Sequence, residues 1–140
     1  MTEATPASMI DVDLDDAKPL RALGDNSEAK VTIVRAQLDE SKSSTPAEHN
    51  IHVWLDCGED DVDDIQCWIP LPTANWKEQD YKSYTKAVNR FKEFCTSLSF
   101  SPPIDTDRLI GLSGWVLVSE EEDDRNPGTF RNGVRSWLTK

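Results

Sequence analysis

Two tryptophans, Trp54 and Trp68, are the residues of this chain whose type and spacing best suit ligand chemistry. Each stands in a short run in which apolar and polar residues alternate, 51–57 and 65–71. A strand directs alternate side chains to opposite faces, so both indoles are expected on the face that points away from the core. An indole exposed there can stack on a nucleic acid base, a contact worth roughly 1–3 kcal/mol whatever the base.

Cations that could meet phosphates lie in the segments expected beside these tryptophans. The four candidates are Lys42, Arg125, Arg131 and Arg135. Together with Trp54 and Trp68 they form a predicted site for single-stranded nucleic acid, which needs flat aromatic surfaces and positive charge. The alternative is that the two tryptophans pack on each other, on the N-terminal segment or across a homodimer interface, since cross-strand aromatic pairs stabilise sheets unaided.

The two alternating runs that contain the tryptophans predict a β-hairpin with one face on a core. The core-facing residues are Ile51, Val53, Leu55 and Cys57 in the first run and Ile65, Cys67, Ile69 and Leu71 in the second. The acidic stretch 58–64 between the runs predicts a solvated turn, so the tip of the hairpin is expected to repel phosphates.

The rest of the chain supplies three further strands and a helix. The strands are predicted at 29–39, 109–119 and 129–138, and the helix at 77–100. In the first strand the apolar positions change face after Ile33, which indicates a bulge or a strong bend. In the helix the apolar residues recur every three or four positions. In the last strand, Gly133 predicts a kink within one strand rather than a hairpin turn.

The resulting order is β-β-β-α-β-β, so the chain is predicted to be mainly β with one helix. This is the order of the OB-fold, a five-stranded Greek-key barrel whose ligands lie across strands 2 and 3. A small β-sandwich with a packed helix is the competing architecture. The length of 140 residues suits one domain over residues 20–140, preceded by an acidic disordered arm over residues 1–19.

The charge and the composition of the chain limit the kinds of function that it can have. The formal net charge of -11 opposes phosphate binding, but the acids are concentrated in three blocks, 3–28, 56–64 and 120–124. No apolar run approaches the ~20 residues of a membrane span, and the first residues lack the features of a signal peptide. Three cysteines without a CxxC pair indicate reduced thiols. No contact with a membrane and a cytoplasmic location are therefore expected.

Motifs for catalysis or metal binding do not occur in the sequence. His49 and His52 lie near Cys57 and Cys67, but without the spacing of a zinc site. Phosphate-binding glycine loops, nucleophile elbows and the HExxH motif are also missing. The chain is therefore predicted not to be an enzyme and to need neither metal nor cofactor.

A row of cations marks one side of the predicted helix. Lys82, Lys86 and Arg90 follow one another at intervals of four residues, and Glu78 is placed to pair with Lys82. An ordinary solvated helix face is the simplest interpretation of this row, and a functional surface is the alternative.

Four short segments carry a resemblance to a known family. They are 20–31, 41–43, 107–111 and 128–138. The chain resembles a phage-encoded family of small OB-fold proteins, usually described as single-stranded DNA-binding or of unknown function and found among replication and recombination genes. In that family the closing strand has a similar Asn-x-Val followed by an aromatic residue, here Asn132, Val134 and Trp137. The resemblance implies an accessory protein of DNA metabolism, located in the host cytoplasm.

The sequence thus predicts a non-catalytic protein that binds single-stranded DNA of any sequence and serves replication or recombination. The acidic arm is expected to recruit replication or recombination proteins, or to compete with DNA. The rival prediction is an acidic protein-interaction module that binds a basic partner protein, as a mimic of DNA or as an inhibitor.

Overall fold

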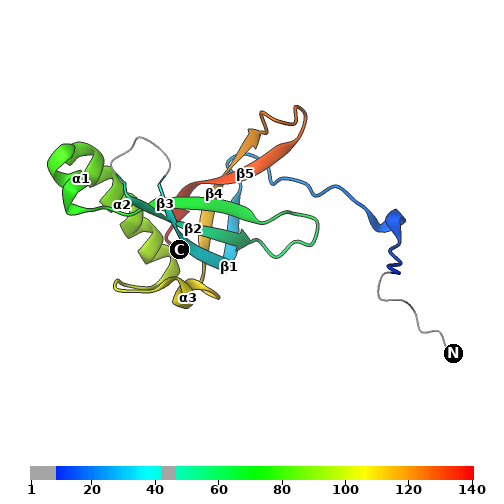
Figure 1. The fold of residues 1–140 in the computed structure, drawn as a ribbon, viewed down its shortest axis with the longest axis horizontal. Helices are drawn as coiled ribbons and strands as arrows, with labels where there is room; N and C mark the ends of the chain where they lie inside the picture. Colours follow the sequence, from blue (N-terminus) through cyan, green and yellow to red (C-terminus); the bar gives the residue numbers. More distant parts are fainter. Residues whose placement is uncertain (1–8, 42–46) are drawn as a thin grey trace.

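Five antiparallel strands form the body of the structure, a computed structural model that describes residues 9–41 and 47–140 (Figure 1). They are β1 (Glu28–Glu40), β2 (His49–Asp56), β3 (Ile65–Pro70), β4 (Ser113–Glu122) and β5 (Phe130–Leu138). Their hydrogen-bonded order is β3-β2-β1-β4-β5, with the long β1 at the centre. The mainly β class that the sequence predicts is confirmed.

The two outer strands of this order, β3 and β5, also contact each other. The four antiparallel pairings between them make β3 and β5 run in the same direction. In the described sheet no backbone ladder joins these two strands. The sheet therefore curls until its ends meet, and a seam remains between β3 and β5.

A bulge in β1 determines which residues reach the outer face. The β2 partners change from Ile33–Leu55 to Arg35–Trp54, which leaves Val34 as an extra residue. Because side chains alternate, this extra residue turns Arg35 outward instead of into the core. The predicted bulge is confirmed, and it places an arginine beside Trp54.

The helices differ from the single helix predicted at 77–100. Three occur between β3 and β4: α1 (Ala74–Gln79), α2 (Tyr81–Leu98) and α3 (Thr106–Leu109). Asp80 interrupts the pattern because its carboxylate accepts a hydrogen bond from the Ser83 backbone N–H and begins α2. No helix in the described part of the chain is long and apolar enough to cross a membrane.

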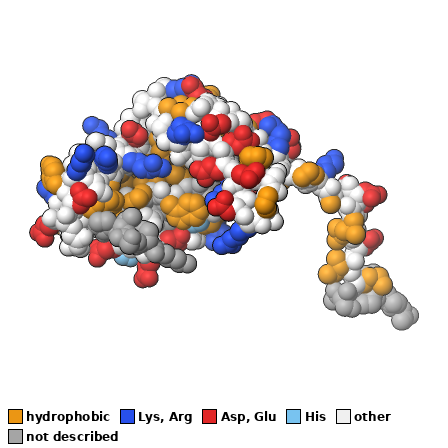
Figure 2. All heavy atoms as spheres, turned by 90° about the horizontal axis from the view of Figure 1, so that it is seen from above, with side chains coloured by type: hydrophobic (Ala, Val, Ile, Leu, Met, Phe, Trp, Pro, Cys, Tyr) orange, Lys and Arg blue, Asp and Glu red, His pale blue; other side chains and the backbone are white. Residues whose placement is uncertain are grey.

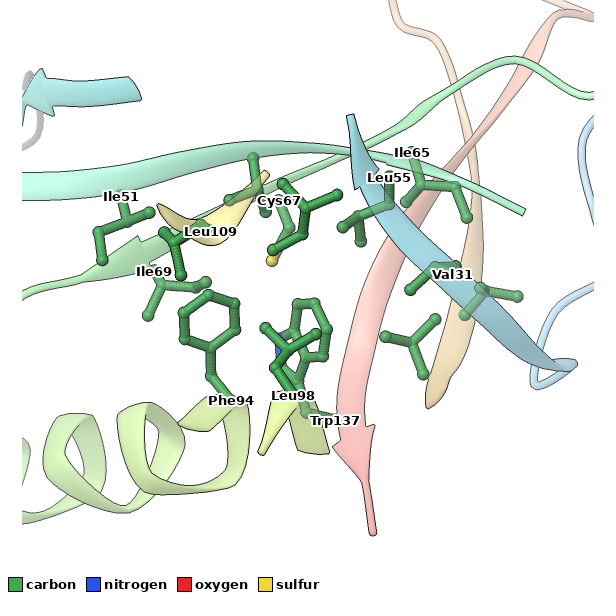
Figure 3. Packing of buried hydrophobic residues seen from close by; sticks show 14 residues of the cluster. Val31, Ile51, Leu55, Ile65, Cys67, Ile69, Phe94, Leu98, Leu109 and Trp137 are labelled. Carbon is green, nitrogen blue, oxygen red and sulfur yellow. The ribbon is translucent and has the colours of Figure 1, made fainter. Parts of the chain in front are cut away.

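The core lies between the inner face of the sheet and α2 (Figure 3). Its fully buried members are Val31, Ile33, Val53, Leu55, Ile65, Ile69, Phe94, Leu109, Val116 and Val118. Phe94 of α2 meets Trp137 of β5 edge to face, with ring centroids 4.9 Å apart. The second half of the predicted apolar stripe packs against this core, but Tyr81 and Val88 in the first half of α2 are exposed.

The C-terminal strands confirm one prediction and correct another. β5 continues through Gly133 as one strand, as predicted, and a Cβ at Gly133 would lie 2.9 Å from Ser119 Oγ. Any other residue there would displace the Ser119 hydroxyl, where β4 and β5 approach closely. The strand predicted at 109–119 begins later, at Ser113, because Leu109 ends α3 and is buried in the core.

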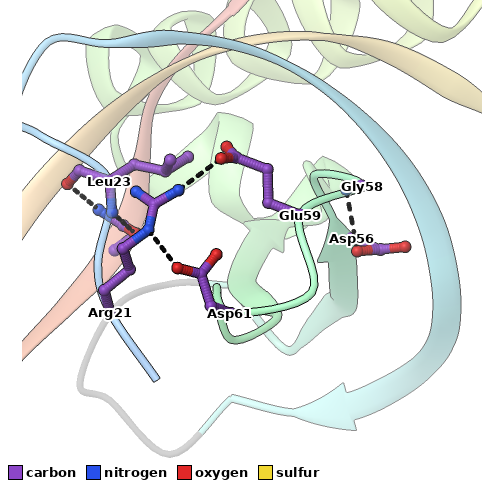
Figure 4. Close-up of polar contacts among 7 residues, drawn as sticks. Arg21, Leu23, Asp56, Gly58, Glu59 and Asp61 are labelled. Carbon is purple, nitrogen blue, oxygen red and sulfur yellow. Dashed lines mark hydrogen bonds and ion pairs between the residues drawn. The ribbon is translucent and has the colours of Figure 1, made fainter. Parts of the chain in front are cut away.

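The segment before β1 is bound to the body of the domain. Arg21 forms ion pairs with Glu59 and with Asp61, both in the β2–β3 turn, where the three side chains converge (Figure 4). The Asn132 side chain bonds both backbone groups of Leu23. Residues 9–20 precede these contacts, are exposed and extend away from the sheet (Figure 1).

Candidate nucleic-acid interface

The outer face of β1, β2 and β3 carries aromatic and polar side chains in register. Trp54 is paired with Arg35 of β1 and Gln66 of β3. His52 is paired with Gln37 and Trp68 in the next row. Both tryptophans therefore lie on the face predicted for them, and His52 lies between them.

The three aromatic rings of this face form one continuous stack. The His52 ring lies 3.7 Å from the Trp54 ring and 4.2 Å from the Trp68 ring, centroid to centroid. Two indoles at these distances cannot share one face of the imidazole, so they cover opposite faces. This explains why the His52 residue is only 7% exposed although it points away from the core. The tryptophans pack together through His52, not directly.

Hydrogen bonds fix the middle ring of the stack. His52 Nδ1 lies 3.1 Å from Asp39 Oδ2, and Nε2 lies 2.9 Å from Gln66 Oε1. Gln37 donates to the other oxygen of Asp39 at 2.6 Å, and Arg35 donates to Gln37 at 3.1 Å. A polar chain thus crosses all three strands and sets the orientation of the rings.

The two tryptophans differ in what remains accessible. The guanidinium carbon of Arg35 lies 4.2 Å from the Trp54 ring centroid, a cation–π distance. Because His52 stacks on the same indole, both faces of Trp54 are covered. Among the described residues, Trp68 has a ring contact with His52 alone, and 49% of its surface is exposed. The stack Arg35–Trp54–His52–Trp68 therefore ends in one open indole face.

A groove of about 620 Å³ adjoins Trp68 at the seam between β3 and β5. Phe130 of β5 also lines it and is 49% exposed. Arg90 reaches the groove from α2, and Arg131 from β5. Arg21, which is paired with Glu59 and Asp61, also lines the groove. The groove therefore combines two half-exposed aromatic rings with three arginines.

Carboxylates line the end of the groove nearest the hairpin tip. Asp63 and Asp64 immediately precede β3, while Glu121 and Asp123 lie at the end of β4. Burial, with added repulsion from Asp56 and Asp63, raises the pKa of Asp64. Asp and Glu side chains gather on the same part of the body, beside the arm, in Figure 2. A phosphate is disfavoured at this end.

The four predicted cations occupy different places. Arg131 lines the groove, opposite Glu121 in the strand register. Arg135 donates to Asp25 at 2.8 Å, and Arg125 is exposed in the β4–β5 turn. Lys42 lies outside the described residues.

Sequence reasoning missed Arg35 and Arg90 as members of this surface. The sequence does indicate the position of Arg35, because a bulge after Ile33 reverses the alternation and turns the following odd-numbered residues outward. No sequence signal identified Arg90 as a groove residue, because that depends on where α2 crosses the seam.

One cysteine, Cys67, is among the residues that line the groove. Cys67 and Cys95 are buried, and burial raises the pKa of both thiols. Cys67 faces the core while His52 faces outward, as predicted. Across the two described ranges, no three potential metal ligands converge.

Comparison of the chain with protein-family models and with curated proteins returns no match. The resemblance to phage-encoded single-stranded DNA-binding proteins stays a prediction. The function is therefore inferred from the geometry of the interface.

Proposed function

We propose that the chain is an OB-fold domain that binds single-stranded DNA without base specificity and without catalysis. The strand order β3-β2-β1-β4-β5, the contact of β3 with β5 and the helices between β3 and β4 support the OB-fold. OB-folds bind single strands across strands 2 and 3. Here that face carries the aromatic stack.

The open face of Trp68 is the observation that carries the proposal. A base placed on it adds one more ring to a stack that is already aligned by His52 and Trp54. Because hydrogen bonds hold His52, little side-chain freedom is lost when the base binds. Every base has a flat face, so the contact does not select a sequence.

Trp54 has a different role in this proposal from the one the sequence predicts. Both faces of its indole are covered, so it supports the stack from behind instead of meeting a base itself. Arg35 gives that end of the stack a positive charge. Lys42, Arg125 and Arg131 remain candidates for phosphate contacts, whereas Arg135 is engaged with Asp25.

Replication or recombination of phage DNA is the setting we propose, in the host cytoplasm. The exposed segment 9–16 would recruit partner proteins of these processes. It alternates acidic with apolar residues, and Ile10 and Leu14 are 81% and 80% exposed. The same segment favours the second candidate function, an acidic interaction module for a basic protein.

Fluorescence titration with oligo-dT at two salt concentrations tests the proposal. Wild-type tryptophan fluorescence should be quenched, and affinity should fall at the higher salt because phosphate contacts release counterions. Trp68→Ala should weaken binding by roughly 1–3 kcal/mol. Trp115→Ala, which removes an outward-facing tryptophan of β4, is the matched control and should bind normally.

Lack of quenching in wild type at about 50 mM salt, where phosphate contacts are strong, contradicts the proposal. Binding of polylysine that disappears when residues 1–16 are deleted would then support the interaction module instead.

A further inference from the structure

One side of α2 presents three cations in a row, at the end of the groove opposite the carboxylates. Arg90 lines the groove, and Lys86 and Lys82 follow on the next two turns toward the start of the helix. Lys82 and Lys86 are exposed. Within residues 9–41 and 47–140 none of the three forms an ion pair. The predicted Glu78–Lys82 pair is wrong, because the break at Asp80 separates α1 from α2.

Charge around Trp68 is therefore distributed asymmetrically. Toward the hairpin tip the groove holds Asp63, Asp64, Glu121 and Asp123. Arg131, opposite Glu121, and Arg21, already paired with Glu59 and Asp61, offset these acids only in part. Toward α2 it holds Arg90, followed by two more cations. A polyanion bound at Trp68 is repelled in the first direction and attracted in the second.

We infer that the DNA strand which stacks on Trp68 leaves the groove toward α2, with its phosphates on Arg90, Lys86 and Lys82. This inference rests on the proposed function and names the path of the backbone. Successive members of the row are about 6 Å apart along the helix axis. That interval is close to the separation of successive phosphates in an extended single strand.

The two ends of the row differ in how they are held. The Nε–H of Arg90 is buried without a hydrogen-bond partner, and the guanidinium lies beside the Cys67 thiol. Arg90 is therefore a half-buried charge in the lining of the groove. Lys86 and Lys82 are free to adjust to a flexible backbone. Glu93, one turn beyond Arg90, is an exposed acid and limits the row on that side.

A pair of lysines on one helix gives the matched test. Lys86 belongs to the row, while Lys92 is exposed on another side of α2. Oligo-dT affinity is measured as a function of salt for wild type, Lys86→Ala, Lys82→Ala/Lys86→Ala and Lys92→Ala. Each phosphate contact contributes about 0.7 to the slope of log K against log salt for single strands.

The expected result is a slope smaller by about 0.7 for Lys86→Ala and by about twice that for the double variant, with Lys92→Ala unchanged. The final extent of tryptophan quenching should be the same in all four proteins, because Trp68 is intact. If Lys86→Ala and wild type give equal slopes of log K against log salt while quenching is preserved, the path along α2 is wrong. That result would not contradict DNA binding itself. Failure of wild type to bind oligo-dT would overturn both proposals.

Discussion

The rings of His52 and Trp68 stack at a centroid distance of 4.2 Å across neighbouring strands. The two residues are direct partners in the β2–β3 register, and Trp54 covers the other face of the imidazole. The histidine therefore acts as a spacer between two indoles. It holds Trp68 in place while leaving one face of that ring open.

Removal of the spacer should destabilise the sheet. His52→Ala deletes two stacking contacts and leaves Asp39 and Gln66 without their shared partner. We expect the free energy of unfolding to fall by about 2 kcal/mol, measured by urea denaturation. His49→Ala, at the exposed start of the same strand, is the control and should cost much less. Equal losses for the two variants would argue against a structural role for the stack.

Asn132 should be needed to hold the N-terminal segment. Its side chain accepts from the Leu23 backbone N–H at 2.7 Å and donates to the carbonyls of Leu23 and Ser119. Asn132→Ala leaves these backbone groups unpaired and should cost about 1–3 kcal/mol in unfolding free energy. Asn126→Ala, in the exposed β4–β5 turn, serves as the comparison. The anchoring role is refuted if both variants unfold at the wild-type urea concentration.

Asp25 should make stability depend on pH in the acid range. Its carboxylate accepts from the Glu120 backbone N–H and from Arg135, which lower its pKa below the ordinary 3.8. Because the folded-state pKa is depressed, the stabilisation is complete well above pH 3.8 and is lost as pH falls through the folded value.

Urea midpoints of wild type and Asp25→Ala should therefore differ at neutral pH and converge below the folded-state pKa. Asp60→Ala, which removes an exposed carboxylate of the hairpin tip, should show no such convergence. A difference that persists unchanged at pH 2 would contradict this account of Asp25.

Arg131 and Arg135 should contribute unequally to DNA binding. Arg131 lines the groove, whereas Arg135 is engaged with Asp25. Arg131→Ala should weaken oligo-dT binding by roughly twofold to tenfold, because it removes the positive charge that offsets Glu121 in the groove. Arg135→Ala should change stability more than affinity. A larger loss of affinity for Arg135→Ala than for Arg131→Ala in an anisotropy titration would contradict this assignment.

Alternation along the chain was enough to predict the hairpin, the bulge after Ile33 and the outward position of both tryptophans. These features depend on local sequence, because side-chain direction follows from counting residues along a strand. The break at Asp80 was missed because no Gly or Pro interrupts residues 77–100, although aspartate is a common helix cap.

Contacts between distant residues could not be predicted from local patterns. The pairing of Arg135 with Asp25 joins residues at opposite ends of the chain. The position of Arg90 in the groove depends on how α2 crosses the seam between β3 and β5. The insertion of His52 between two indoles depends on side-chain rotamers that a pattern of alternation does not contain.

The most direct measurement is a spectrum of the indole N–H groups in ¹⁵N-labelled protein, recorded while oligo-dT is added. The chain has five tryptophans, which give five resolvable signals. The account predicts that Trp68 shifts most, that Trp54 shifts less, and that the buried Trp76 and Trp137 are nearly unchanged. Shifts confined to Trp115, or a Trp68 signal that does not move at saturating oligo-dT, would contradict it.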